Sequence, residues 1–211
     1  TNPIANYGVA LNIAPYEVIE TTYECVDGTE LPVFFWVLPE NRERAERALP
    51  EFLDHVRHME ETCGPYPFRN EKYGIVETPH LGMEHQSAIA YGNGYQDGYR
   101  GTDLSGTGQG LAWDFIIVHE AAHEWWGNKI TVSDWADFWI QEGFATYYAL
   151  LAEKELFGDD HYHYQLYKSA QELSMQDDAG GGTSLLNPKS SSLTFYQRGA
   201  WVLHALRSRI G

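Results

Sequence analysis

The stretch WDFIIVHEAAHEWWGN, residues 113–128, decides the fold of this chain. Its run of apolar residues and its closing Gly-Asn pair predict one helix over residues 112–127. Within it, His119 and His123 stand four positions apart, which places both imidazoles on one face of a helix and within reach of one ion. Zinc prefers such nitrogen ligands. The alternative is an ordinary helix with two histidines on its surface.

Two glutamates complete the predicted metal centre. Glu120 follows the first histidine, and its carboxylate is expected to take a proton from the metal-bound water and pass it to the leaving amine. A catalytic zinc has three protein ligands and keeps its fourth position for water. Glu142 follows His123 after 18 intervening residues, in an apolar segment where a buried carboxylate is expected to be paired or to bind a metal. We therefore predict one zinc ion per chain, bound by His119, His123 and Glu142.

Outward from this helix, the chain divides into a first part rich in strands and a second part made mostly of helices. Runs of β-forming residues bounded by turn residues predict strands at residues 8–13, 31–37 and 73–78 and around Ile89. Helical spacing of apolar residues predicts helices from Pro50 to Cys63 and at residues 137–157, 160–176 and 196–209. Strands followed by helices, without β-α-β alternation, indicate an α+β fold in which a small mixed sheet precedes a mostly helical half.

Two glycine-rich segments interrupt these elements. Residues 92–110 contain seven glycines and no hydrophobic period, which predicts a long loop that is either a lid over the site or a variable surface insertion. Residues 178–193 form a second predicted loop before the last helix.

The composition excludes some classes of partner. The chain has 211 residues, and 14 basic against 30 acidic side chains give a net charge of 14 − 30 = −16. Such a field repels nucleic acid and anionic membrane surfaces and favours metal ions and ligands with a free amine. The sequence has no apolar run as long as a membrane span. Cys25 and Cys63 are expected to form one disulfide or to stay as two buried thiols, so the compartment stays open: cytoplasmic, periplasmic or extracellular.

The spacing of these motifs resembles that of a known family. H-E-x-x-H, 18 residues and a glutamate within W-x-x-E-G-F-A are similar to the M1 family of zinc aminopeptidases, a branch of the gluzincins. Three more segments resemble its signatures in the same order: HEWWGN at residues 123–128, GMEHQ at residues 82–86 and FYQRGA at residues 195–200. The resemblance covers roughly residues 30–211.

This resemblance implies a domain organisation. Residues 31–211 are expected to form a thermolysin-like zinc peptidase catalytic domain. Residues 1–30 are expected to be the tail of an N-terminal β-domain or leading strands. The C-terminal helical domain of the family is absent, so the chain is expected to be a fragment that works with other domains of the full-length protein.

The resemblance also implies roles for four residues near the metal. Glu84 would bind the free α-amine of a peptide substrate, which limits cleavage to the first peptide bond. Gly82 and Met83 would pair with the substrate backbone. Tyr196 would donate its hydroxyl to the oxyanion as the bond breaks. The implied function is removal of N-terminal residues from peptides by a metal-activated water.

Several positions depart from the family pattern. Leu81 stands where the family has glycine and His85 where it has asparagine, which leaves the effect on substrate specificity open. Ala149 stands where family members often have a glutamate that orients a histidine ligand. Candidates to replace that glutamate are Glu153, Asp137 and Glu124.

Two alternatives to an aminopeptidase follow from these departures. One is a zinc hydrolase of other specificity. The other is a pseudoenzyme that acts as a binding module, although the presence of Glu120 and Tyr196 and an open three-ligand site argue against it, since structural zinc sites usually close with a fourth protein ligand. His161 and His163 are predicted to be surface residues. The preferred N-terminal residue and the oligomeric state are not determined by the sequence.

Overall fold

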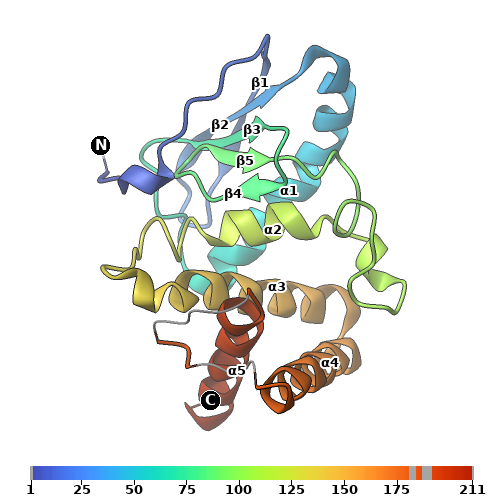
Figure 1. The fold of residues 1–211 in the computed structure, drawn as a ribbon. Helices are drawn as coiled ribbons and strands as arrows, with labels where there is room; N and C mark the ends of the chain where they lie inside the picture. The colour runs from blue at the N-terminus through green and yellow to red at the C-terminus, as the bar shows by residue number, and fades with distance from the viewer. Residues whose placement is uncertain (1, 181–183, 187–191, 211) are drawn as a thin grey trace. The chain divides into compact units, whose positions relative to one another are not determined.

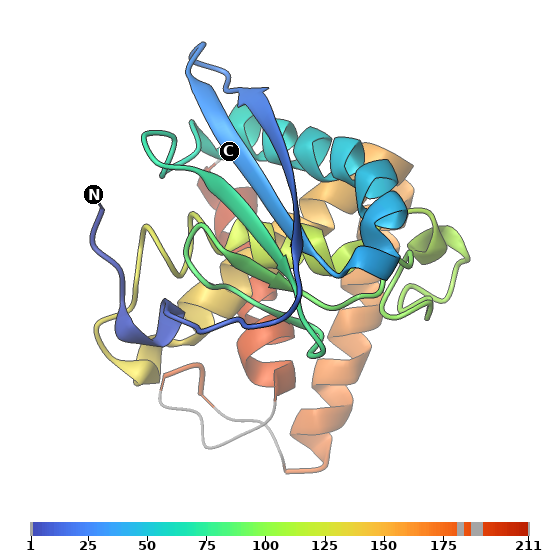
Figure 2. The same ribbon diagram turned by 90° about the horizontal axis from the view of Figure 1, so that it is seen from above.

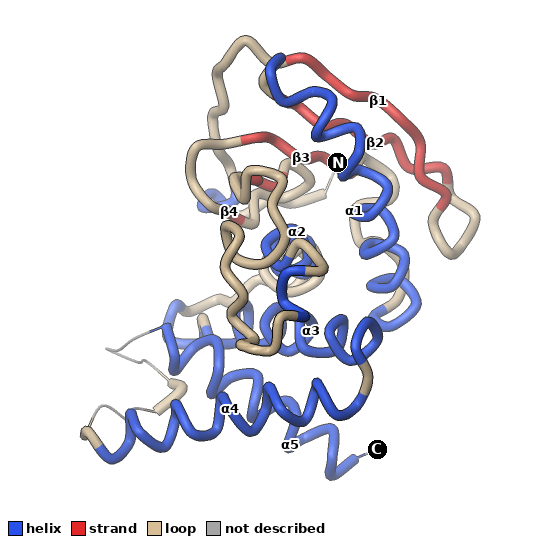
Figure 3. Tube along the Cα trace, turned by 90° about the vertical axis from the view of Figure 1, so that its right-hand side faces the viewer, coloured by secondary structure: helices blue, strands red, loops and turns tan. Residues whose placement is uncertain are grey.

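The computed structural model describes residues 2–180, 184–186 and 192–210. The chain forms two compact units, Thr1–Lys129 and Ile130–Gly211. In the described residues, all strands belong to the first unit, and the second unit is helical (Figures 1 and 3). The predicted α+β class, with a small mixed sheet followed by a mostly helical half, is therefore confirmed. The predicted loop 178–193 lies partly outside the described residues.

The first unit is built on a mixed five-stranded sheet. The strands are β1 (Glu17–Glu24), β2 (Glu30–Val37), β3 (Tyr73–Glu77), β4 (Gly82–Met83) and β5 (Ile89–Tyr91). Their order is β1-β2-β3-β5-β4. The pairs β2–β3 and β3–β5 are parallel, whereas β1–β2 and β4–β5 are antiparallel. The order puts β4 at one edge of the sheet.

Helix α1 (Arg42–Cys63) covers β1 and β2 (Figure 2). Strand β2 alternates buried and more exposed side chains, as expected for a strand with one face on a core. Phe35 of β2 packs near Phe52 of α1, with ring centroids 6.1 Å apart. Since α1 joins the parallel strands β2 and β3, the unit contains a β-α-β crossover, and the expectation of no such alternation was wrong.

Other predicted boundaries in the first unit also need correction. Residues 8–13 contain no strand; a short 3₁₀ helix, Asn6–Gly8, lies there instead. Pro50 does not begin a helix but lies inside α1. Helix α2 is Phe115–Ala122, shorter than the predicted 112–127. Two further 3₁₀ turns are Pro39–Asn41 and Gln109–Leu111. Residues 92–110 are otherwise a loop, as predicted.

In its described residues, the second unit contains three α-helices and two shorter helical segments. They are the 3₁₀ turn Trp135–Asp137, α3 (Trp139–Phe157), α4 (Asp159–Asp178), a π-helical turn Thr194–Arg198 and α5 (Gly199–Ile210). A Cβ atom at Gly143 of α3 would lie 2.9 Å from Cα of Gly199, so both glycines are needed for this close approach. His161 is buried rather than on the surface, with Glu153 3.6 Å from its Nε2, whereas His163 is exposed as predicted.

Both cysteines are free thiols. Cys25 is buried and Cys63 is partly buried, which agrees with the second of the two expectations. Among the described helices, none is long and apolar enough to cross a membrane.

Candidate metal centre and active site

The histidine pair lies on a short buried helix that is fixed at its start. The side chain of Asp114 caps α2 by accepting hydrogen bonds from the backbone N–H groups of Ile116, at 3.0 Å, and Ile117, at 3.3 Å. One helical turn of spacing then brings His119 and His123 together, with their Nε2 atoms 3.2 Å apart. Both side chains are buried. The predicted common helix face is therefore confirmed.

A backbone contact orients the second imidazole. Nδ1 of His123 lies 2.9 Å from the carbonyl oxygen of Trp126. A hydrogen bond from Nδ1 to this carbonyl leaves the lone pair of Nε2 available for a metal, as is usual for histidine ligands. Helix α2 ends at Ala122, with His123 as its C-cap. The chain turns directly after it, which brings the carbonyl of Trp126 to the ring of His123.

The separation of the two nitrogens fits a zinc ion. Two ligands at about 2.0–2.1 Å from a tetrahedral zinc are about 3.3–3.4 Å apart. The Nε2 atoms of His119 and His123 are 3.2 Å apart. The donor set present in the first unit therefore suits zinc without rearrangement.

Glu120 lies against the edge strand β4. A Cβ atom at Gly82 would lie 2.8 Å from Cδ of Glu120, which is closer than real Cβ atoms approach a carboxyl carbon. Glycine at position 82 therefore leaves the space that the Glu120 carboxylate occupies. The family resemblance implied only a contact of Gly82 with the substrate backbone, so this second role was missed.

Glu84 is a buried carboxylate beside the same residues. It is 4% exposed, and its oxygen lies within 4.8 Å of ligand atoms of Glu120 and His123. Its carboxylate accepts no hydrogen bond from the described residues. Buried carboxylates are usually paired, so this one is suited to a cationic ligand.

His85 does not place a positive charge beside Glu84 at neutral pH. The side chain is buried, and burial lowers the pKa of His85 below its usual 6.5, an effect that His80 reinforces and Glu84 opposes. The imidazole is therefore mostly neutral at pH 7. A free amine that enters the site meets no repulsion from it.

A buried network holds the segment that follows Glu84. The backbone N–H of Ser87 donates to Oε1 of Glu124 at 2.7 Å, and the hydroxyl of Tyr66 donates to Oε2 at 3.1 Å. Lys72 donates to the carbonyl of Ser87. Burial raises the pKa of Glu124 to about 8, while the bonds from Ser87 and Tyr66 and the charge of Lys72 act in the opposite direction.

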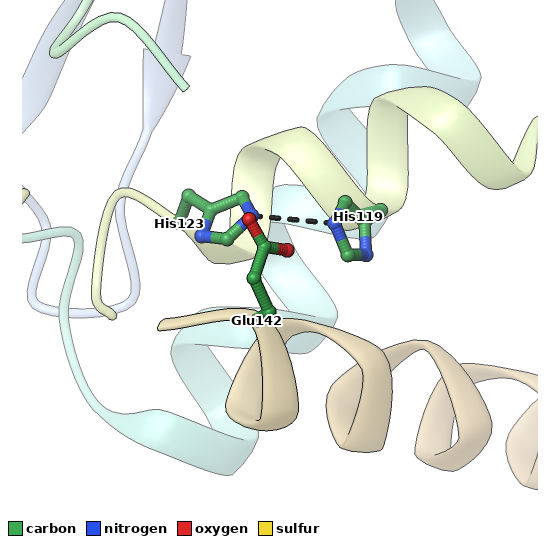
Figure 4. A group of neighbouring side chains, drawn as sticks. All are labelled: His119, His123 and Glu142. Carbon is green, nitrogen blue, oxygen red and sulfur yellow. Dashed lines mark hydrogen bonds between the residues drawn. The ribbon is translucent and has the colours of Figure 1, made fainter. Parts of the chain in front are cut away.

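The remaining predicted site residues belong to the second unit. Glu142 lies in the first turn of α3 and is 4% exposed. Figure 4 draws Glu142 of α3 with the other two predicted ligands, His119 and His123, whose Nε2 atoms are joined by the dashed line. Tyr196 lies in the π-helical turn before α5 and is partly buried. Ala149 is buried in α3, and Glu153, one of the candidates to replace the missing glutamate, has its Oε2 atom 3.6 Å from Nε2 of His161.

These features define a class of protein: a domain with a buried histidine pair at one short helix, suited to bind a metal ion. Comparison with known proteins narrows the class. Residues 64–211 match the family described as Peptidase family M1 domain. The chain therefore belongs to peptidase family M1.

Curated relatives agree with this family. The chain is 28% identical over 157 residues to Probable aminopeptidase 1 of Sulfurisphaera tokodaii, covering 69% of this chain and 20% of the relative. It is 23% identical over 224 residues to Endoplasmic reticulum aminopeptidase 1 of Mus musculus, covering 98% of this chain and 23% of the relative. The chain thus spans about a fifth to a quarter of the length of these relatives.

Solved structures share the fold. The M1 zinc metallopeptidase from Deinococcus radiodurans superposes with a TM-score of 0.64 at 23% identity, covering 92% of this chain and 41% of that one. Aminopeptidase A of Legionella pneumophila, in complex with aspartic acid, gives a TM-score of 0.65 at 19% identity, covering 93% and 23%.

Proposed function

We propose that the full-length protein is a zinc aminopeptidase and that this chain carries its catalytic centre. One observation carries the proposal: the buried carboxylate of Glu84 accepts no hydrogen bond from the described residues and lies within 4.8 Å of Glu120 and His123. A carboxylate at this place provides a site for a cation next to a metal-binding helix. The free α-amine of a peptide is such a cation near neutral pH.

The proposed metal ligands are His119, His123 and Glu142, in a thermolysin-like arrangement. The Nε2 separation in the histidine pair supports zinc, and the relatives from Deinococcus radiodurans are zinc metallopeptidases. A bound zinc ion would supply Lewis acidity and lower the pKa of water at its open position. The proposed domain limits are residues 31–211 for the thermolysin-like part and residues 1–30 for the tail of an N-terminal β-domain or leading strands.

The other residues act by position and by proton transfer. Glu120 accepts the proton of the attacking water and passes it to the leaving amine. Glu84 holds the α-amine, and Gly82 and Met83, at the edge of the sheet, pair with the backbone of the first residues of the peptide. Tyr196 donates a hydrogen bond to the oxyanion.

The test compares substrates with free and blocked amines. Full-length protein is assayed on chromogenic amino acid amides and on their N-acetylated forms. We expect cleavage of the free forms only, and a steep loss for Glu84→Ala at unchanged zinc content. Equal cleavage of both forms would favour a zinc hydrolase of other specificity, and no cleavage of either form at full zinc occupancy would favour a binding module.

A further inference from the structure

Two hydrogen bonds to Ser87 fix the C-terminal end of the segment from Glu84 to Ser87, and we call their partners, Glu124 and Lys72, the clamp. The N–H of Ser87 bonds to Glu124, and its carbonyl bonds to Lys72. A Cβ atom at Gly74 would lie 3.2 Å from the carbonyl carbon of Ser87, so β3 approaches this carbonyl closely. Both backbone polar groups of one residue are thereby fixed inside the first unit.

Ser87 has an unusual backbone conformation. Its φ angle is 51°, in the left-handed region that residues other than glycine rarely adopt. Such a conformation is strained and persists where surrounding contacts determine it. The bonds from Glu124 and Lys72 are the contacts that do so. The chain therefore turns at Ser87 because the clamp holds it there.

Glu124 connects this turn to the metal-binding end of α2. It directly follows His123 and is fully buried. One carboxylate oxygen accepts from Ser87 and the other from Tyr66. Ser87, the hydrogen-bond partner of Glu124, lies three positions after Glu84 in the chain. The carboxylate of Glu84 lies within 4.8 Å of a ligand atom of His123.

We propose that Glu124 is a positioning residue that sets where Glu84 stands relative to the metal site. Its carboxylate accepts a hydrogen bond from Ser87. Because Glu124 directly follows His123, this bond ties the turn that carries Glu84 to the end of the metal-binding helix. This inference rests on the proposed aminopeptidase function and assigns its amine specificity to a residue that does not touch the substrate. Glu124 thereby links recognition of the amine to the metal-binding helix.

The chain offers a matched control in Glu60. This side chain is also buried, at 2% exposed. It accepts hydrogen bonds from the hydroxyl of Tyr23, at 2.8 Å, and from the backbone N–H of Tyr66, at 2.7 Å. Among the described residues, none of its hydrogen bonds involves the segment from Glu84 to Ser87. It meets the Glu124 network only through Tyr66, whose hydroxyl donates to Glu124. Replacing it tests what the loss of a buried carboxylate does to the unit in general.

The experiment is a double-mutant cycle in the full-length zinc-loaded protein. Glu84→Ala, Glu124→Ala and the double variant are assayed on a free-amine amide substrate. We expect Glu124→Ala alone to reduce kcat/KM about tenfold or more, mainly through KM, and to add little in the Glu84→Ala background. Glu124→Gln keeps an acceptor for Ser87 and should restore most of the activity. Glu60→Ala should give an effect that is the same with and without Glu84.

Inhibitor binding gives a second readout that does not depend on turnover. An L-amino acid hydroxamate contacts both the metal and the amine site, whereas acetohydroxamate contacts the metal alone. Glu124→Ala should weaken the first by about tenfold and leave the second and the zinc content unchanged. If Glu124→Ala is unstable, Lys72→Met opens the other side of the clamp and should give the same pattern.

The outcomes separate the inference from the function it rests on. Additive effects of Glu84→Ala and Glu124→Ala, or equal weakening of both hydroxamates, would overturn the positioning role alone. If Glu84→Ala itself left cleavage of free-amine substrates unchanged, the proposed aminopeptidase function would be what fails, and the positioning role would fall with it.

Discussion

The carboxylate of Glu120 occupies the space that a side chain at Gly82 would need: a Cβ atom at position 82 would lie 2.8 Å from Cδ of Glu120. The edge strand thus sets the position of the proposed proton acceptor. Geometry at this point matters because a misplacement of about 1 Å can lower a rate on the order of 100-fold.

Gly82→Ala is expected to lower kcat by about 10- to 100-fold, since the new methyl group displaces the Glu120 carboxylate. Zinc content and the unfolding midpoint should change little. Gly8→Ala is the control, because a Cβ atom there has its nearest neighbour at 3.7 Å. Steady-state kinetics of both variants decide the point, and wild-type turnover in Gly82→Ala would refute the shared-space argument.

Glu120→Gln is expected to bind zinc as the wild type does and to lose nearly all hydrolysis. The amide has nearly the shape of the carboxylate but cannot accept the proton of the attacking water. The measurement pairs elemental analysis with turnover on an amino acid amide. Substantial activity in a zinc-loaded variant would show that another group takes the proton.

Each proposed zinc ligand should be required for retention of the metal. His119→Ala, His123→Ala and Glu142→Ala are expected to lose zinc during dialysis against a chelator that the wild type resists. The exposed His80 provides the control, since His80→Ala should keep the metal. Zinc content by elemental analysis is the readout, and full occupancy in Glu142→Ala would remove that residue from the ligand set.

Tyr196→Phe is expected to reduce kcat with little change in KM. The hydroxyl acts mainly when the oxyanion forms, so its loss should cost about 2.7–4 kcal/mol, as for one oxyanion-hole donor. A matched rise in KM with unchanged kcat would assign Tyr196 to substrate binding instead.

The carboxyl of Asp114 should make stability depend on pH. Burial raises its pKa from 3.8 to about 6. Between these values the folded protein holds a proton that the unfolded chain releases, so this group's contribution to the free energy of unfolding rises as the pH falls from about 6 to 4. The total change is up to about 3 kcal/mol.

Asp114→Asn tests this dependence, since asparagine also caps helices but does not titrate. Urea unfolding between pH 4 and 8 should show the wild type gaining stability relative to the variant toward acid pH. A difference that is constant across this range would mean that Asp114 titrates normally in the folded protein.

Local patterns predicted the helical half and the histidine pair well, because both depend on short-range spacing. They failed where contacts between residues far apart in the sequence determine the structure. Pro50 favoured a helix start, but the apolar residues before it extend α1 back to Arg42. The parallel pairing of β2 with β3 depends on how α1 folds over the sheet, and local sequence does not encode it.

The site was predictable to a similar extent. The proximity of Glu84 to Glu120 and His123 agrees with what the family resemblance implied. The role of Gly82 beside Glu120 and the clamp on Ser87 were not predictable. Both arise from packing between segments about 40 residues apart, and a buried glutamate such as Glu124 has no distinct signature in sequence.

Strand β4 has only two residues, Gly82 and Met83, at the edge of the sheet. An edge this short gives another chain too few main-chain hydrogen bonds to add a stable strand, which protects the protein from self-association through this edge. For a proposed peptide substrate, the same short strand forms few main-chain hydrogen bonds beyond the first residues of the peptide. Long and short peptides would then dissociate at similar rates after a single cut, which favours a distributive trimming of chains over processive digestion.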